Sequence, residues 1–259
     1  MKIMTCNIRF SSMGHDTGPR LWKNRKECCF SAIEKCGPDV ICLQECHNDQ
    51  LADFKARFAG FGCVHGNSFA SEQYPENAIF YRRGAYENCG VGAWQLSETP
   101  HIPGSTSWGT ECVRMVNWVL LRGAGGLVRV VNTHFDHTSQ LARDNAARMI
   151  NEDASAWDPS LVQILTGDLN CDPGNTAIET LAAAGWIDTM PEADAFRPTL
   201  HEFIGTAWDR DLGICGKGRM DYVFVRGVTP RRSARIVYDH DGDVYPSDHF
   251  FVFSEIEEV

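Results

Sequence analysis

The 259-residue chain contains 43% hydrophobic and 22% charged residues, which is typical of an ordinary globular protein with a sizeable core. It has no run of 18 apolar residues, so we expect neither a membrane span nor stable membrane association. The net charge of −10 argues against binding nucleic acid by non-specific electrostatic attraction alone, and it suits a carboxylate cluster that binds a divalent cation.

The N terminus and the cysteines bear on the cellular compartment. Met1 and Lys2 lead directly into a strand pattern rather than a signal peptide, and a signal removed beforehand would leave the same start. The 11 cysteines are scattered and include no C-x-x-C pair, which argues against a structural zinc site and a thioredoxin-like redox pair. We therefore expect free thiols in a reducing cytoplasm, and nothing in the chain indicates an obligate protein partner.

The N-terminal part alternates strand and helix patterns. Residues 2–9 form the first predicted strand, and residues 11–20, rich in Gly, Asp, Pro and Ser, form a loop. Residues 22–36 carry apolar side chains at helical spacing, and Gly37-Pro38 ends this helix. The next predicted elements, in order, are a strand at 39–44, a helix at 49–58 and a strand at 77–81.

A long loop opens the second part of the chain. Residues 91–109, rich in Ser, Pro, Gly and Trp, exceed the length of a simple connection, so we expect this loop to line a binding site. The predicted elements after it, in order, are a hairpin of strands 113–121 and 127–133, a helix at 140–157, a strand at 161–165, a helix at 176–184, and strands at 220–225, 235–237 and 250–256. No linker divides the chain, so residues 1–259 are predicted to form a single domain.

Polar residues stand at one edge of six predicted strands. The central example is L-V-Q-I-L-T-G-D-L-N at residues 161–170, where Asp168 and Asn170 would face the same side of an extended chain. A turn explains any one case, but six cases in an apolar framework predict a site where strand ends converge. The other five positions are Asn7, Glu45, His134, Asp221 and the pair Asp248-His249. Carboxylates and carboxamides without a cysteine ligand favour Mg²⁺, with Mn²⁺ as a substitute.

The segment His134-Phe135-Asp136-His137 also has a zinc interpretation. Metallo-β-lactamase-type hydrolases bind two zinc ions with H-x-H-x-D-H. Here Asn132 replaces the first histidine, and no later pair of ligand motifs follows. The sequence therefore favours the hard-cation site.

Six motifs in order carry a family resemblance: T-C-N-I-R, L-Q-E, N-T-H-F-D-H, T-G-D-L-N, R-M-D-Y-V-F and P-S-D-H. They resemble the endonuclease/exonuclease/phosphatase superfamily over nearly the whole chain. The resemblance implies an α/β fold, a four-layer α-β-β-α sandwich of two packed mixed sheets with helices on both outer faces. It also implies metal-dependent cleavage of a phosphate ester by water. Trp22-x-x-Arg25, W-Q-L-S-E-T-P and the following S-W look most like small bacterial members related to deadenylase-like exonucleases.

The resemblance assigns metal and catalytic roles. The implied metal-binding residues are Asn7, Glu45 and Asp248, with Glu45 the direct ligand and Asp248 near a second metal position. Asp168 is implied to orient or deprotonate the attacking water, and Asn170 to hydrogen-bond the phosphate. His249 is the implied catalytic imidazole, and Asp221 fixes its tautomer. His134 is a further implied catalytic residue, and Glu76 supports it.

Four further residues are predicted to contact substrate. Arg114 resembles the family arginine that reaches the phosphate, and the other candidates are Arg25, Asp136 and Trp108. Trp94 and Trp108 suit stacking on a base or contact with an apolar group, and ordinary packing explains them equally well.

Two departures from the family pattern argue against DNA repair. Abasic-site endonucleases carry Asp two residues after the first Asn, where this chain has Arg9, and they rely on basic surfaces. Inositol-polyphosphate phosphatases have a longer signature around the position of Asp221.

The favoured function is metal-assisted, in-line hydrolysis of a phosphodiester by water, nuclease-like on a small or single-stranded substrate. The alternative is a phosphomonoesterase or a lipid-headgroup phosphodiesterase (sphingomyelinase-like) with the same catalytic residues. An inactive binding module is a third hypothesis, but it would be expected to lack one of the key residues Glu45, Asp168, Asp248 and His249, and all four are present.

Overall fold

The computed structural model describes residues 1–11, 13–65, 76–207, 218–230 and 233–257. Its strands form two six-stranded sheets, in the orders β11-β12-β1-β2-β4-β3 and β5-β6-β7-β8-β10-β9. The first sheet contains β1 (Lys2–Asn7), β2 (Val40–Cys46), β3 (Phe61–His65), β4 (Glu76–Arg82), β11 (Arg235–Val237) and β12 (Phe251–Glu255). The second contains β5 (Glu87–Gln95), β6 (Met115–Gly123), β7 (Gly126–His134), β8 (Val162–Asp168), β9 (Ile187–Asp188) and β10 (Asp221–Arg226).

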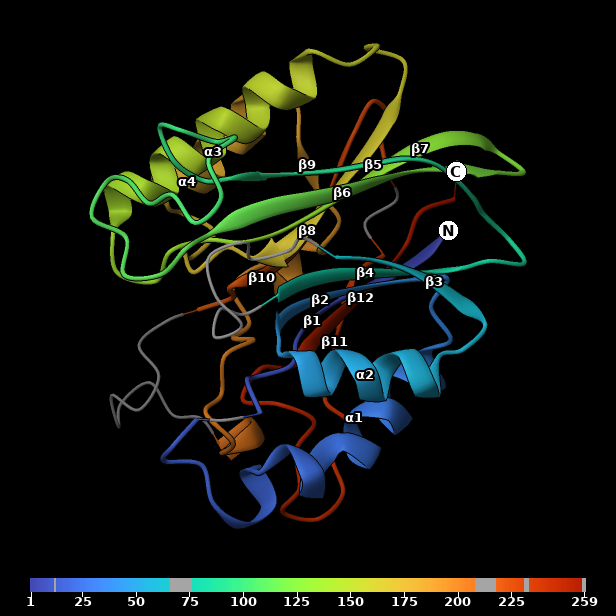
Figure 1. The fold of residues 1–259 in the computed structure, drawn as a ribbon, viewed down its shortest axis with the longest axis vertical. Coiled ribbons are helices and arrows are strands. Elements are labelled where there is room, and N and C mark those ends of the chain that lie inside the picture. Colours follow the sequence, from blue (N-terminus) through green and yellow to red (C-terminus); the bar gives the residue numbers. More distant parts are fainter. Residues whose placement is uncertain (12, 66–75, 208–217, 231–232, 258–259) are drawn as a thin grey trace.

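Helices cover the outer faces of the two sheets (Figure 1). The helices are α1 (Trp22–Cys36) and α2 (Asn48–Arg57) on the first sheet and α3 (Gln140–Ser155) and α4 (Thr176–Ala183) on the second, with short 3₁₀ turns at Gly18–Arg20, Glu192–Asp194 and Gly205–Ala207. The predicted four-layer α-β-β-α sandwich is therefore confirmed.

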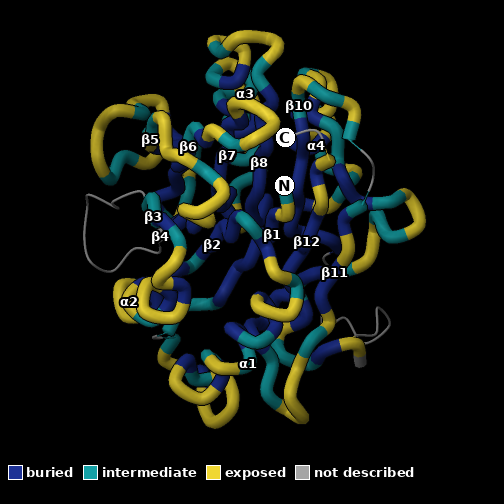
Figure 2. Tube along the Cα trace, turned by 90° about the vertical axis from the view of Figure 1, so that its right-hand side faces the viewer, coloured by how far each residue is buried: buried dark blue, intermediate teal, exposed yellow. Residues whose placement is uncertain are grey.

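Three apolar cores hold the four layers together. Successive side chains of a strand point to opposite faces, so Ile3 packs between the sheets while Met4 packs against α1 and α2. In the second sheet Ile164 joins the core between the sheets, and Leu165 joins the core under α3 and α4. The central strands are apolar on both faces because both faces are covered. Figure 2 shows these strands buried and the helices exposed on their outer sides.

The sequence missed three strands, β3, β5 and β9. Strand β5 occupies the first part of the predicted loop 91–109, so that prediction was wrong for residues 91–95. Its pattern was hidden by Gly92, where an added Cβ would stand 2.6 Å from the Trp118 ring. In β3 an added Cβ at Gly62 would stand 2.1 Å from the Tyr81 ring. Glycine lies in these edge strands because a neighbouring aromatic ring covers the backbone, a reason invisible in local sequence.

Sheet register brings the polar strand edges together. In the parallel pair β7/β8, His134 lies opposite Asp168, and in the antiparallel pair β8/β10, Asp168 lies opposite Asp221. In the first sheet Asn7 ends β1, and β12, which begins just after Asp248-His249, runs antiparallel to β1. Strand ends and the starts of their antiparallel neighbours therefore meet at one edge of the sandwich.

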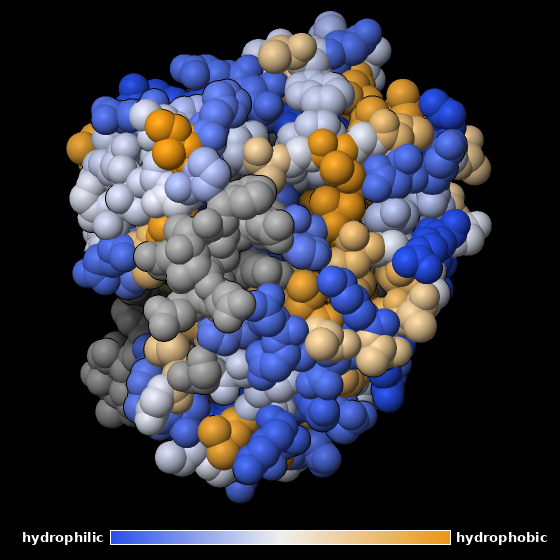
Figure 3. All heavy atoms as spheres, in the orientation of Figure 1, coloured by the Kyte–Doolittle hydropathy of each residue, from blue (hydrophilic) through white to orange (hydrophobic). Residues whose placement is uncertain are grey.

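The opposite edge holds the two ends of the chain. The Met1 amino group donates to the Ile256 carbonyl at 2.6 Å, and Figure 1 shows the N and C labels on the same side. On the face in Figure 3, apolar side chains form small groups among hydrophilic ones. Within the described ranges, no helix has both the length and the apolar character needed to span a membrane.

Candidate active site

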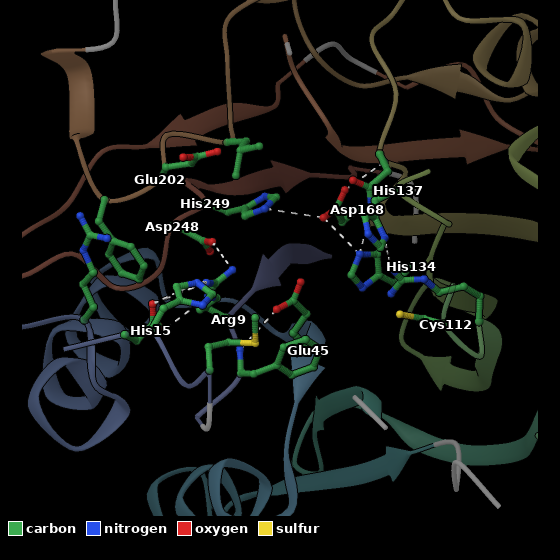
Figure 4. Close-up of a pocket in the computed structure, with 18 residues that line it drawn as sticks. Arg9, His15, Glu45, Cys112, His134, His137, Asp168, Glu202, Asp248 and His249 are labelled. Atoms are coloured by element: carbon green, nitrogen blue, oxygen red, sulfur yellow. Dashed lines mark hydrogen bonds and ion pairs between the residues drawn. The ribbon is translucent and has the colours of Figure 1, made fainter. Parts of the chain in front are cut away.

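A cavity of about 670 Å³ lies at the edge where the polar strand ends meet. Small-molecule sites usually enclose about 300–1,000 Å³, so this cavity has the size of a metabolite site. The predicted residues that line it are Glu45, Arg114, His134, Asp168, Asn170, Asp248 and His249. Figure 4 shows Glu45, Asp168 and His249 pointing toward one central space from different parts of the chain.

Asn7 is hydrogen-bonded to two carboxylates of this site. Its side-chain nitrogen donates to Glu45 at 3.1 Å and to Asp168 at 3.0 Å. Its side-chain oxygen accepts the backbone N–H of Arg9 at 3.0 Å, which orients the amide with its nitrogen toward the carboxylates. Asn7 is buried and does not line the cavity. In this geometry Asn7 holds both carboxylates in position, and its side-chain oxygen is occupied by the Arg9 N–H.

Glu45 faces the cavity because the strand is distorted there. The pairing of β2 with β4 shifts register between Leu43 and Cys46, and Glu45 has a φ of 58°. A bulge of this kind re-aims a side chain out of the strand alternation. Besides Asn7, the carboxylate accepts a bond from the Phe10 backbone N–H at 3.3 Å, and no ion pair joins it to another described residue.

Asp168, Asp221 and His249 form a buried charged group. Nδ1 of His249 donates to Asp221 at 2.9 Å, while its Nε2 lies 3.7 Å from Oδ2 of Asp168. Burial lowers the pKa of His249, but the carboxylates of Asp221 and Asp168 outweigh this and raise it well above its usual value. Burial raises the pKa of Asp168 to about 6, although the imidazolium of His249 opposes the shift. The Asp168 carboxylate can thus accept a proton near neutral pH, and the His249 ring is stabilised in its cationic form.

Asn170 reaches the cavity by a turn rather than along an extended chain. Its φ of 50° is left-handed, and its backbone N–H donates to Oδ1 of Asp168 at 2.9 Å. The prediction that Asp168 and Asn170 share one side of an extended segment was therefore wrong, although both side chains line the cavity.

His134 is a buried neutral imidazole. Its Nε2 lies 3.0 Å from the side-chain nitrogen of Asn170 and 3.4 Å from Oδ2 of Asp168. Burial, with Arg114 and His249 nearby, lowers its pKa well below the usual value. Within the described residues Nδ1 is buried without a hydrogen-bond partner. The predicted partner Glu76 begins β4, but its side chain lies outside the described part of the structure.

Arg114 brings a positive charge to the cavity wall. Its guanidinium donates to Nδ1 of His137 at 3.3 Å, and Nε2 of His137 lies 3.3 Å from the Glu111 carboxylate. Arg114 is only 6% exposed, its Nε has no hydrogen-bond partner among the described residues, and its charge helps to lower the pKa of Asp136 without a direct ion pair. A buried guanidinium without a directly paired carboxylate is costly, so the arrangement suits an anionic ligand.

A match to a family of known proteins agrees with this geometry. Residues 4–249 match the Endonuclease/Exonuclease/phosphatase family. The chain belongs to this family. Endonuclease/exonuclease/phosphatase proteins are hydrolases of phosphate esters, so the resemblance of the sequence motifs is confirmed. A search of curated proteins found no match.

Solved structures share the family fold over the whole chain. A functionally unknown conserved protein from Enterococcus faecalis has a TM-score of 0.84 and 25% identity, with 99% of each chain covered. A mannosyl-6-phosphatase from Bacteroides thetaiotaomicron has a TM-score of 0.83 and 22% identity, with 99% of each chain covered. TDP2 from D. rerio, complexed with single strand DNA product, has a TM-score of 0.73 and 17% identity, with 98% of this chain and 97% of that chain covered.

Family enzymes use divalent metals, and the donors at this site fit one. Ligand atoms of the buried group Asp168, Asp221 and His249 lie within 4.8 Å of one another, so this group could bind a metal. An ion between Asp221 and His249 would break their 2.9 Å hydrogen bond. Coordination by Glu45, whose carboxylate faces the cavity without a cationic partner among the described residues, breaks no ion pair. The oxygen-rich donors match the preference of Mg²⁺ or Mn²⁺.

Arg25 does not contact the cavity, contrary to the prediction. It is 0% exposed, and its guanidinium donates to five backbone carbonyls, those of Ile8, Arg9, Phe10, Arg20 and Pro246. Arg25 therefore cross-links the segments that carry site residues.

Asp136 and Trp108 also lie outside the cavity lining. The Asp136 carboxylate is 2% exposed and accepts bonds from Thr138, Ser139 and Glu111. Burial raises the pKa of Asp136, but the Ser139 and Thr138 donors and the charge of Arg114 together bring it below its usual value. Trp108 is half-buried, and its carbonyl accepts the Ser139 hydroxyl. Trp94 packs against the core beneath α3 and α4, so the structure agrees with ordinary packing for this residue rather than with a substrate contact.

Several residues of the cavity wall were not singled out from the sequence, although the loop of residues 199–218 was expected to determine substrate specificity. Glu202 and Phe203 line it, and they have consecutive left-handed φ angles of 48° and 64°. The backbone N–H of Glu202 donates to the Asp248 carbonyl at 3.1 Å, which holds this segment against the site. His137 was overlooked as a lining residue although it closes the motif N-T-H-F-D-H, and that motif was the signal that could have identified it.

Replacing Arg25 by Met is expected to lower the free energy of unfolding by roughly 2–4 kcal/mol, because buried carbonyls lose a charged donor. Chemical denaturation measures this loss, and Lys23→Met on the exposed side of α1 is the control. If Arg25→Met left the free energy of unfolding unchanged and raised KM, the prediction that Arg25 contacts substrate would stand.

Proposed function

We propose that the protein is a divalent-metal-dependent phosphoesterase that hydrolyses a small phosphodiester in this cavity by in-line attack of water. The observation that supports this most strongly is the polarity of the cavity wall. The buried Arg114 guanidinium faces the same space as the carboxylates of Glu45 and Asp168. A phosphate group with a bound cation complements both signs of charge at once.

Glu45 is the residue that would hold the metal ion, and Asn7 keeps its carboxylate in place. When bound, such an ion stabilises negative charge on the phosphoryl oxygens as a Lewis acid. Arg114 adds a fixed cation to the cavity wall, and the side-chain amide of Asn170 lines the same wall, where its nitrogen contacts His134 and the Phe135 carbonyl. Each contact grows stronger as charge accumulates in the transition state.

Asp168 and His249 would move the protons. With a pKa of about 6, the Asp168 carboxylate can accept a proton from the attacking water near neutral pH. His249, held through Nδ1 by Asp221, presents Nε2 to the cavity as a cationic donor to the phosphoryl or leaving oxygen. Asp221 acts through His249 and has no exposure of its own.

Phosphomonoester hydrolysis is the second candidate, and Arg20 favours it. Arg20 also lines the cavity, and no ion pair joins it to another described residue. Together Arg20 and Arg114 could balance a dianionic phosphate, whereas a diester needs only one such charge. Glu202 and Phe203, also in the wall, suit a small leaving group rather than a long anionic strand.

A substrate panel with MgCl₂ or MnCl₂ tests the proposal. It contains an aryl phosphodiester, single-stranded DNA and RNA, sugar phosphates and sphingomyelin. We expect hydrolysis of the small diester that EDTA abolishes and Mg²⁺ restores. Arg114→Met should lower kcat/KM by about 10²–10³-fold, the usual loss for one transition-state donor. Arg148→Met, at an exposed position on α3, is the matched control.

Full activity in excess chelator would contradict the metal requirement. Faster hydrolysis of sugar phosphates than of any diester would replace the leading function by the second candidate. Equal rates for Arg114→Met and the control would show that the Arg114 guanidinium does not contact the reacting phosphate.

Asp221 and His249 are expected to act as one unit. Asp221→Asn and His249→Gln should each lower kcat/KM by about 10²–10⁴-fold, and the double variant should lose little more. The reason is that the carboxylate works only by orienting and charging the ring. A double-mutant cycle on kcat/KM measures the coupling, with His101→Gln at an exposed position as the control. Strict additivity of the two losses would show independent roles.

A further inference from the structure

Arg9 is an internal counter-ion for two acidic residues of the cavity wall. Its Nη1 lies 3.0 Å from Oδ2 of Asp248, and its Nε lies 3.3 Å from Oδ2 of Asp16. Both carboxylates are buried and line the cavity, as does Arg9. Figure 4 shows the Arg9 guanidinium beside Asp248. One guanidinium thus satisfies two carboxylates that would otherwise be free to bind a cation.

The backbone of Arg9 is held in an uncommon conformation to place this charge. Its φ of 54° lies in the left-handed region, which non-glycine residues rarely adopt. The backbone N–H donates to Asn7, and the carbonyl accepts from Gln50 at 2.8 Å and from Arg25 at 2.7 Å. Three buried side chains therefore fix the position from which the guanidinium extends.

The position of Arg9 separates the carboxylates of the cavity into two groups. Asp248 and Asp16 are paired with the guanidinium, whereas Glu45 has no ion pair with a described residue. A divalent cation bound at Asp248 would have to compete with a fixed charge already 3.0 Å away and would be repelled by it. Glu45 also lies within the field of Arg9 but has no direct ion pair with it, so a cation on the Glu45 side meets a smaller penalty than one at Asp248.

We propose that Arg9 takes the place of a second metal ion, so that the cavity binds one divalent cation on the Glu45 side and none at Asp248 and Asp16. This inference rests on the proposed function only in requiring that a metal ion binds at Glu45. It assigns Arg9 as a positioning residue that sets the metal stoichiometry and keeps Asp248 out of direct coordination.

Removing Arg9 should open a second cation site. In Arg9→Gly the space between Asp248 and Asp16 is vacated, both carboxylates lose their counter-ion, and glycine accepts the positive φ without strain. Two unpaired carboxylates flanking one space are suitable ligands for a hard divalent cation. Arg9→Lys keeps a positive charge at the position and should preserve the original stoichiometry.

Isothermal titration calorimetry of the full chain with MnCl₂ measures the stoichiometry. We expect one ion for the wild type and for Arg9→Lys, and two for Arg9→Gly, the second weaker. Arg20→Ala removes another cavity arginine that has no ion pair with a described residue, so it should bind one ion. Circular dichroism establishes that each variant is folded. Two ions in the wild type, or one in folded Arg9→Gly, would overturn the inference.

Asp248→Asn gives an independent test in a background that keeps Arg9. Because Asp248 is not expected to coordinate the ion, Mn²⁺ affinity should change by less than about tenfold, the lower bound for losing even an indirect contact. Glu45→Gln should remove measurable binding. Equal losses in the two variants would contradict the inference. Absence of Mn²⁺ binding by the wild type would contradict the proposed function as well, whereas one ion in Arg9→Gly contradicts only the role of Arg9.

Discussion

The side-chain amide of Asn7 is the contact on which the geometry of the cavity depends. It lies at the end of β1 and donates to Glu45 of the same sheet and to Asp168 of the other sheet. Two carboxylates from different sheets would otherwise repel one another across a buried space. The bridge brings them together without a cation, and the Arg9 backbone N–H fixes the orientation of the bridge. Under the proposed function, a metal ion would therefore meet a preformed pair of acidic groups.

Strained backbone conformations place several side chains around the Asn7 amide bridge. Arg9, Glu45 and Asn170 all have left-handed φ angles, of 54°, 58° and 50°. Each such residue costs of order 1–3 kcal/mol, and this strain persists only where the surroundings hold it. Here the surroundings are the buried hydrogen bonds of Asn7, Asp168 and the Arg25 guanidinium. The side chains that hold these strained residues are thus the same ones that position the charged groups of the site.

Much of this arrangement could be predicted from sequence because it follows from strand periodicity. Runs such as residues 161–165 identify buried strands, and polar residues at their ends identify the edge of the sheets. The family motifs then supplied the four layers. Local patterns could not reveal β5, whose glycines make room for Trp118, a residue of a neighbouring strand. Nor could they place Glu45, because a bulge changes which side of the strand a side chain faces.

The assignments of charged residues show the same limit. Arg25 and Arg114 are both buried arginines, and the sequence predicted a substrate contact for each of them. Their partners distinguish them: Arg25 donates to five carbonyls, whereas Arg114 has a histidine contact and an unpaired Nε among the described residues. The first is a structural cross-link and the second a candidate anion contact. Long-range hydrogen bonding, which only the folded chain displays, makes the distinction.

The Mn²⁺ affinity of Asn7→Leu tests most directly whether the amide bridge builds the metal site. Leucine keeps the branched shape of Asn7 but removes the donor of both hydrogen bonds, so Glu45 and Asp168 lose the contact that aligns them. Asn88→Leu, at an exposed position on β5, is the control. The account predicts that Asn7→Leu weakens Mn²⁺ binding by about 10–100-fold, as for other residues that orient metal ligands. A folded Asn7→Leu variant that binds Mn²⁺ as tightly as the wild type would contradict it.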